Sequence, residues 1–165
     1  YKSKQAFLFQ WPRIDGTYHG NALQIERFTK GSGRYKKIYT SISMHFRDPV
    51  SNSLVVIPKR LTSGLRRSLA RDNADLEFIE IGDELFDRKV EVKASSMQFA
   101  RDVLSSHQIQ QGLVEIRGQT RDLEIQVKGT ELNYQERSNI MDLQYLTDVL
   151  NFLAEFMGYI ERSGR

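Results

Sequence analysis

The stretch Ile79-Glu-Ile-Gly-Asp-Glu-Leu-Phe-Asp-Arg-Lys-Val-Glu-Val-Lys93 organises the middle of the chain. Gly82-Asp83 predicts a turn, because Gly adopts positive φ at little cost and Asp hydrogen-bonds to its own backbone. From Phe86 onward, alternating residues through Val92 predict a half-buried strand. We therefore expect this stretch to form a turn followed by a strand.

A helix is expected directly after that strand. Ser95-Ser96 supplies an N-cap, since a serine hydroxyl accepts a hydrogen bond from a free backbone N–H of the first turn. Four apolar residues then recur at helical spacing on one face: Phe99, Ala100, Val103 and Leu104. The central unit is thus predicted to be turn, strand and helix.

Composition places the chain among ordinary globular domains. It has 165 residues, of which 39% are hydrophobic and 27% charged, enough to bury a core without disulfides. The absence of cysteine excludes disulfides, thiolate metal sites and cysteine nucleophiles. We expect residues 1–165 to form a single globular domain, excised from a longer membrane-associated protein.

The amino-terminal half is expected to supply most of the sheet. The run 7–12 is aromatic and ends at Pro12, and Asp15-Gly16 and His19-Gly20-Asn21 are typical of turns. Alternation predicts strands over 22–28 and 36–47, joined as a hairpin by a basic, glycine-rich connection. Asp48-Pro49 is expected to end the second strand. A further strand over 53–58 and a short helix or turn over 62–71 should follow.

The carboxy-terminal half is expected to cover that sheet with helices. A short helix over 107–114 follows Ser105-Ser106, and residues 121–130 alternate clearly enough to predict a strand, extended past a bulge at Gly129. Asp142 should cap a long helix. Its apolar stripe comprises Leu143, Leu146, Leu150, Leu153, Met157 and Ile160, widened by Val149 and Phe156. The predicted fold class is α+β, with a largely antiparallel sheet, short helices and a long carboxy-terminal helix packed on it.

A resemblance to a known family rests on the central motif. Gly82-Asp83-x-x-Phe86-Asp87, followed by Phe99-Ala100-x-x-Val103-Leu104, resembles an uncharacterised bacterial domain family with a Gly-Asp-x-x-Phe-Asp strand motif. That domain often follows membrane-spanning segments and has no established activity. The resemblance implies a module on the cytoplasmic side of the membrane, with no catalytic residues to transfer.

Charge is distributed unevenly along the chain. Residues 1–75 hold 14 Lys and Arg against 5 Asp and Glu, whereas residues 76–165 hold 10 against 16. Such polarity is typical of a basic binding face, but also of two halves that attract each other or of plain solvated surface. The candidate binding residues for an anionic surface are Lys30, Arg34, Lys36, Lys37, Arg60, Arg66, Arg67 and Arg71.

Three kinds of partner fit a basic patch. Anionic lipid is favoured by the family resemblance. Nucleic acid is the alternative, but the basic residues are not interleaved with aromatic ones in the sequence, as a single-strand platform requires. A protein partner stays open. We expect an interaction module at a membrane surface or with a protein, and no enzyme, with an enzyme of unrecognised type as the further alternative.

No pattern points to a cofactor or a metal. His19, His45 and His107 lack the spacing of a metal site, and Gly31-Ser-Gly-Arg34 lacks the Gly-Lys-Ser/Thr ending of a phosphate-binding loop. Asp83, Glu84 and Asp87 sit where capping and solvation are the common roles of carboxylates. We therefore predict no catalytic residues, no metal and no cofactor.

Overall fold

The computed structural model describes residues 13–59, 75–119, 122–138 and 140–163. The aromatic run before Arg13 and the short helix or turn predicted over 62–71 lie outside these residues. The described elements are β1 (Ile14–Tyr18), β2 (Asn21–Lys30), a 3-10 turn η1 (Gly33–Tyr35), β3 (Lys37–Pro58), β4 (Glu77–Ile79), α2 (Glu84–Lys89), β5 (Val90–Ala94), α3 (Met97–Leu104), α4 (His107–Gln119), β6 (Leu123–Glu136) and α5 (Leu143–Ser163).

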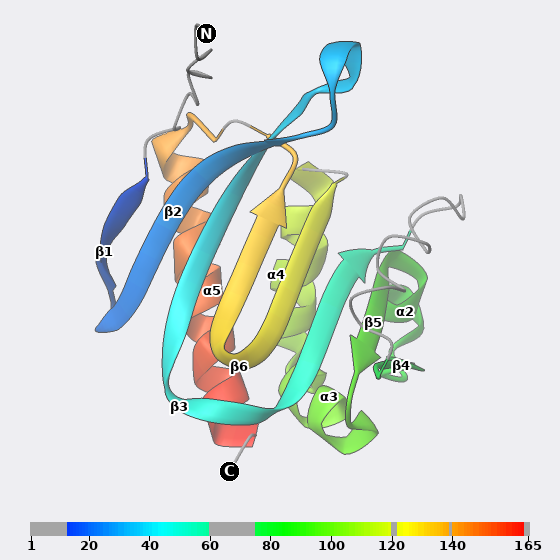
Figure 1. Ribbon diagram of the computed structural model, residues 1–165. Helices are drawn as coiled ribbons and strands as arrows, with labels where there is room; N and C mark the ends of the chain where they lie inside the picture. Colours follow the sequence, from blue (N-terminus) through cyan, green and yellow to red (C-terminus); the bar gives the residue numbers. More distant parts are fainter. Residues whose placement is uncertain (1–12, 60–74, 120–121, 139, 164–165) are drawn as a thin grey trace, which may run out of the picture.

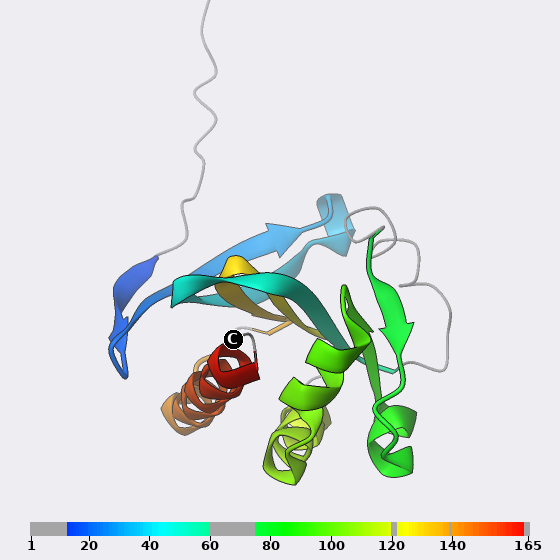
Figure 2. The same ribbon diagram turned by 90° about the horizontal axis from the view of Figure 1, so that it is seen from below.

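The fold has two layers, a sheet and a layer of helices. The strands pair antiparallel in the order β1-β2-β3-β5-β4, with β6 paired to β3. Figure 2 shows the sheet arching over the α-helices of the described residues, which lie beneath one of its faces; none of them covers the other face. The predicted α+β class is confirmed.

The centre of the sheet is built from two nested strands. β6 turns back on itself at Gly129, where φ is +59°, and its ends meet where the Arg137 N–H donates to the Asp122 carbonyl at 2.8 Å. β3 curves around this turn and pairs with both arms of β6. Thr40 in its first part is opposite Glu136, and Leu54 in its second part is opposite Val127. The core of the sheet therefore joins segments far apart in sequence.

The expected strand end at Asp48-Pro49 is wrong, because β3 continues through it. The registers with β2 and β6 stop at Met44 and His45, and pairing with β6 resumes at Val50. Pro49 falls in this interval, where its missing N–H interrupts no ladder hydrogen bond. β3 therefore continues through the proline, between its two stretches of pairing with β6.

The turn expected at Asp15-Gly16 is also wrong, since both residues lie within β1, with Asp15 opposite Gln24. The turn expected next along the chain is confirmed. His19 and Gly20 both have positive φ, 48° and 81°, as a two-residue hairpin turn of the primed type requires.

The strand predicted from Phe86 begins later, at Val90, because residues 84–89 form the helix α2. The Asp83 carboxylate accepts from the N–H groups of Leu85 and Phe86, each at 3.0 Å. The Asp87 carboxylate reaches back to the N–H groups of Ile81 and Gly82, at 3.1 and 2.8 Å. These local hydrogen bonds satisfy the free donors of a helix start, so the motif caps a helix that buries Phe86.

The helices predicted after this unit are confirmed. Ser96 caps α3, whose expected apolar face is buried, and the Ser106 hydroxyl accepts from Ile109 N at 3.4 Å in the first turn of α4. Asp142 caps α5 by accepting from Tyr145 N at 3.0 Å. All these caps are serine or aspartate, as their chemistry predicts.

The predicted stripe of α5 packs against the sheet except at its first residue. Leu150, Leu153, Met157 and Ile160 are buried in one continuous cluster with the inward residues of β3 and β6. Leu143 is 76% exposed, so its assignment to the core is corrected. The first turn of α5 extends beyond the end of the core, and the stripe becomes buried only from the second turn onward.

Candidate functional site

The hairpin connecting β2 to β3 forms a tip that projects beyond the rest of the sheet (Figure 1). Lys30 and Lys37 are opposite each other in register, and between them the Tyr35 N–H donates to the Ser32 carbonyl at 3.1 Å. Gly31 has a φ of +95°, and a Cβ there would lie 2.6 Å from the Tyr35 carbonyl oxygen. The tip therefore closes only with glycine at this position.

Four of the eight predicted basic residues gather on this tip: Lys30, Arg34, Lys36 and Lys37. All four are exposed. Within the described ranges, Arg34, Lys36 and Lys37 have neither a hydrogen-bond nor an ion-pair partner for their side chains. Arg60, Arg66, Arg67 and Arg71 lie outside the described residues, so their convergence with the tip stays a prediction.

Lys30 is held against the sheet by two aromatic rings. Phe28 and Tyr39, opposite each other on β2 and β3, stack with ring centroids 5.5 Å apart and planes 18° apart. The Lys30 ammonium lies 5.3 Å from the Phe28 centroid and 4.9 Å from the Tyr39 centroid, and donates to Gln135 Oε1 at 3.1 Å. The aromatic and basic residues that are separate in the sequence are thus interleaved across the hairpin, which corrects the sequence-based expectation.

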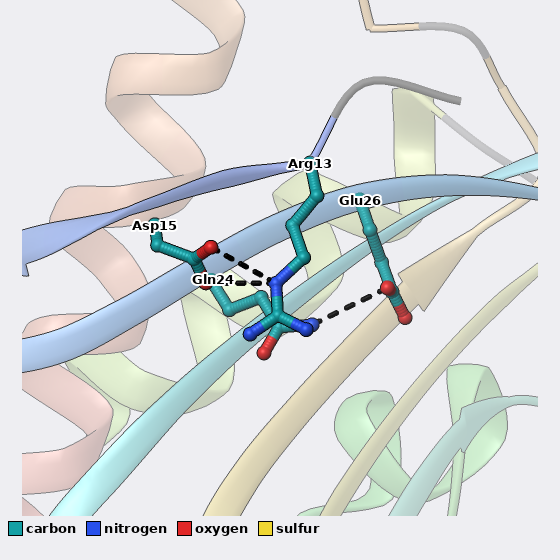
Figure 3. A network of polar contacts seen from close by, with 4 residues as sticks. All are labelled: Arg13, Asp15, Gln24 and Glu26. Atoms are coloured by element: carbon teal, nitrogen blue, oxygen red, sulfur yellow. Dashed lines mark hydrogen bonds and ion pairs between the residues drawn. The ribbon is translucent and has the colours of Figure 1, made fainter. Parts of the chain in front are cut away.

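A polar network runs from Lys30 across the sheet face opposite the described helices. Gln135 donates to Asn133 at 2.9 Å, and Asn133 donates to Ser43 at 2.8 Å. Ser43 in turn donates to Glu131 at 2.6 Å. Figure 3 shows the same face near β1, where Arg13 pairs with Asp15 and Gln24 donates to Glu26. These side chains use their hydrogen-bonding groups on one another. Such a network favours a rigid face, with those groups already occupied and not free to bind a ligand.

A buried carboxylate lies on the opposite face of the sheet, below the hairpin. Glu136 is 1% exposed and accepts from the hydroxyls of Tyr134, Ser138 and Tyr145. Burial, strengthened by the Glu136 charge, raises the pKa of Tyr134 far above its usual range. Burial and the Glu136 hydrogen bond also raise the pKa of Tyr145. The cluster keeps its tyrosines protonated and ties the end of β6 to the start of α5.

A cleft of about 530 Å³ lies at the other end of β2, between the β1–β2 turn and α5. Its wall combines the imidazole of His19 and the guanidinium of Arg47 with the carboxylates of Glu155 and Glu161. The wall therefore carries side chains of both charge signs.

The described ranges hold neither a metal-binding cluster nor a membrane-spanning helix. No group of three or more His, Asp or Glu side chains there is placed to share a metal ion. His19, His45 and His107 lie on separate parts of the fold, at the β1–β2 turn, in β3 and in α4. No helix in the same ranges is long and apolar enough to cross a membrane.

Comparison with known proteins identifies the fold and no family. No family model matches the chain, and no curated protein matches it in sequence. One similar solved structure is the crystal structure of the mycobacterial trehalose monomycolate transport factor A, TtfA, with a TM-score of 0.61 and 13% sequence identity. The match covers 90% of this chain and 70% of that one. At this identity the likeness is one of fold alone.

Proposed function

We propose that this chain is a non-catalytic interaction module that binds an anionic membrane surface through the tip of the β2–β3 hairpin. The observation that carries the proposal is the group of three cations, Arg34, Lys36 and Lys37, on an exposed projection where no described side chain pairs with them. Tyr35, between them, is 81% exposed. An exposed aromatic beside cations suits the interface between lipid headgroups and water.

The magnitude of this attraction indicates how such a module would work. Each Lys or Arg near an anionic surface contributes about 1 kcal/mol, so three or four give about 3–4 kcal/mol, equivalent to a dissociation constant of about 1 mM or weaker. A tip this weak serves a domain already held at the membrane, where the local lipid concentration is high. The resemblance of the Gly82–Asp87 motif to a bacterial domain that follows membrane segments supports such an arrangement on the cytoplasmic side.

The structural comparison is compatible with this proposal. The similar protein is named as a transport factor for trehalose monomycolate, a name that describes transport and not catalysis. A protein partner is a separate part of the same proposal, and the polar sheet face opposite the described helices is the surface that we propose for it.

The test is co-sedimentation with vesicles of phosphatidylglycerol and phosphatidylcholine, compared with phosphatidylcholine alone. The protein should bind the anionic vesicles, and binding should weaken steeply between about 0.05 and 0.3 M salt because exposed charges are screened over roughly 8–10 Å. Arg34→Glu with Lys36→Glu should weaken binding strongly. Lys89→Glu with Lys128→Glu makes the same charge change on α2 and at the turn of β6, and should retain most of it.

Two outcomes would count against the proposal: equal, negligible sedimentation with both lipids, or equal losses for the tip and control variants. Arg66→Glu with Arg67→Glu is a further variant. A loss comparable to that of the tip variant would place these arginines in the same binding face.

Nucleic acid is the second candidate, favoured by the Phe28–Tyr39 pair beside Lys30. Base stacking on an aromatic ring contributes about 1–3 kcal/mol per base. Here one face of each ring is already stacked on the other ring, and Lys30 lies over the pair. Little ring surface is left for a base to stack on, so nucleic acid is the second candidate. Fluorescence anisotropy with a labelled single-stranded oligonucleotide decides: tight binding that falls on Tyr39→Ala would favour nucleic acid over lipid.

A further inference from the structure

Four large apolar side chains are exposed at the end of the molecule that carries the basic tip. Tyr35 and Met141 are each 81% exposed, Leu143 is 76% exposed and Ile38 is 37% exposed. Tyr35 and Ile38 belong to the hairpin, whereas Met141 and Leu143 lie where the chain enters α5. Exposed apolar groups that gather beside a charged patch mark an interaction surface more often than scattered ones do.

Hydrogen bonds bring the entry to α5 next to the hairpin. The Thr40 hydroxyl, three residues beyond Lys37 in β3, donates to the Ser138 carbonyl at 2.9 Å and accepts from Ile140 N at 3.4 Å. Figure 1 shows the first turn of α5 at the same end of the sheet as the tip. Residues about 100 positions apart in sequence therefore share one end of the molecule.

The entry to α5 is held rigidly in this position. Asp142, between Met141 and Leu143, accepts from Tyr145 N at 3.0 Å. The Tyr145 hydroxyl in turn donates to the buried Glu136 at 2.6 Å. The cap and this anchor fix the backbone here, and the two flanking side chains stay 81% and 76% exposed.

We infer that Met141 and Leu143 insert into the boundary between headgroups and acyl chains when the basic tip binds an anionic bilayer. This inference rests on the proposed function and adds a second, apolar contact to it. The occupant is the bilayer interface because Arg34, Lys36 and Lys37 complement its charge, while the exposed apolar groups at the same end of the molecule match the layer just below the headgroups. Binding then has a salt-sensitive part from the tip and a salt-resistant part from α5.

The structure offers a closely matched control for this idea. Met141→Ser with Leu143→Ser removes one exposed Met and one exposed Leu at the basic end. Leu85→Ser with Met97→Ser removes the same two residue types from α2 and α3, where they are 70% and 51% exposed. Both double variants alter exposed positions, so both should keep the parent's circular dichroism and melting temperature.

The variant at Met141 and Leu143 should bind anionic vesicles about 100-fold more weakly than the parent, about tenfold for each side chain that no longer enters the interface. The loss should persist at high salt, where the contribution of the tip is screened. The control variant should bind like the parent.

A fluorescent label gives a direct readout of insertion. The chain has no cysteine, so Met141→Cys provides a single attachment site for an environment-sensitive dye such as NBD, with Leu85→Cys as the control. Anionic vesicles should shift the emission of the Met141→Cys conjugate to the blue and raise it severalfold. The Leu85→Cys conjugate should not respond.

The outcomes separate this inference from the function on which it rests. If the parent binds vesicles but the label at position 141 stays in water and the Met141/Leu143 variant binds normally, insertion is wrong and tip binding stands. If the Met141/Leu143 and Leu85/Met97 variants are weakened equally, the effect is not located at α5 and the inference also fails. If the parent binds no anionic vesicle, both the proposed function and the insertion are overturned.

Discussion

The hydroxyl of Tyr134 offers a sharp test of the buried cluster around Glu136. Tyr134 is 0% exposed and donates to Glu136, as do Tyr145 and Ser138. Tyr134→Phe removes one of these three donors and leaves the ring in place. A hydrogen bond to a charged group contributes about 1.5–3 kcal/mol, so the free energy of unfolding near neutral pH should fall by about that amount.

The same substitution should change how stability depends on pH. Burial raises the pKa of Tyr134 in the folded protein far above its usual range, whereas an unfolded tyrosine ionises with a pKa of about 10. The stabilisation linked to this pKa difference is fully present below about pH 10. It is lost above that pH, because the unfolded chain releases the proton and the folded protein keeps it. The loss is about 1.4 kcal/mol per pH unit.

The measurement is urea unfolding followed by circular dichroism at several pH values from about 7 to 11. The stability advantage of the parent over Tyr134→Phe should shrink by about 1.4 kcal/mol between about pH 9 and pH 11. Other tyrosines and lysines titrate in both proteins and cancel in the difference. Tyr35→Phe is the control, since that side chain is 81% exposed when folded. Parallel curves for the parent and Tyr134→Phe over this pH range would refute the reasoning.

Four further predictions can be checked by standard methods. Leu153→Ala should cost about 2–5 kcal/mol in urea unfolding because the side chain is completely buried, whereas Glu155→Ala on the same helix should cost less than about 0.5 kcal/mol; equal costs would contradict the packing of α5. Asp83→Ala should cost about 0.5–2 kcal/mol by removing the cap of α2, and an unchanged melting temperature would contradict that role. Gly31→Ala should cost about 1–3 kcal/mol from its positive φ and the clash with the Tyr35 carbonyl, and should weaken vesicle binding; a neutral effect on both would show that the tip can close differently. Native mass spectrometry should give the mass of the polypeptide alone, and a stoichiometric ion would contradict the expectation of no metal.

Much of the fold could be predicted because its signals are local. Alternation in 123–127 and the serine before α3 each depend on residues within one or two turns, and both predictions are confirmed. The strand predicted over residues 86–89 is wrong because two sequence patterns compete there. Alternation indicates a strand, but the carboxylates of Asp83 and Asp87 accept hydrogen bonds from four backbone N–H groups, two in the first turn of α2 and two just before its N-cap.

The candidate site was predictable only in part, for a related reason. The cations of the tip are close neighbours in the sequence, so the sequence alone locates them. The Phe28–Tyr39 pair forms across two strands, and the position of Leu143 depends on where the sheet ends beneath α5. Strand register decides the first and the length of the sheet decides the second. Neither can be predicted from the pattern of a single helix or strand.

The nesting of β6 inside the curve of β3 has a consequence for how the chain acquires its structure. Thr40 finds its partner at Glu136 only after nearly the whole domain has been synthesised. Contacts so distant in sequence slow folding, since a long loop must close before they form. Until β6 emerges, the inner edge of β3 is unpaired, and an open strand edge is prone to pair with another chain. Folding of this domain should therefore be slow, with the sheet completed only when β6 pairs with both parts of β3.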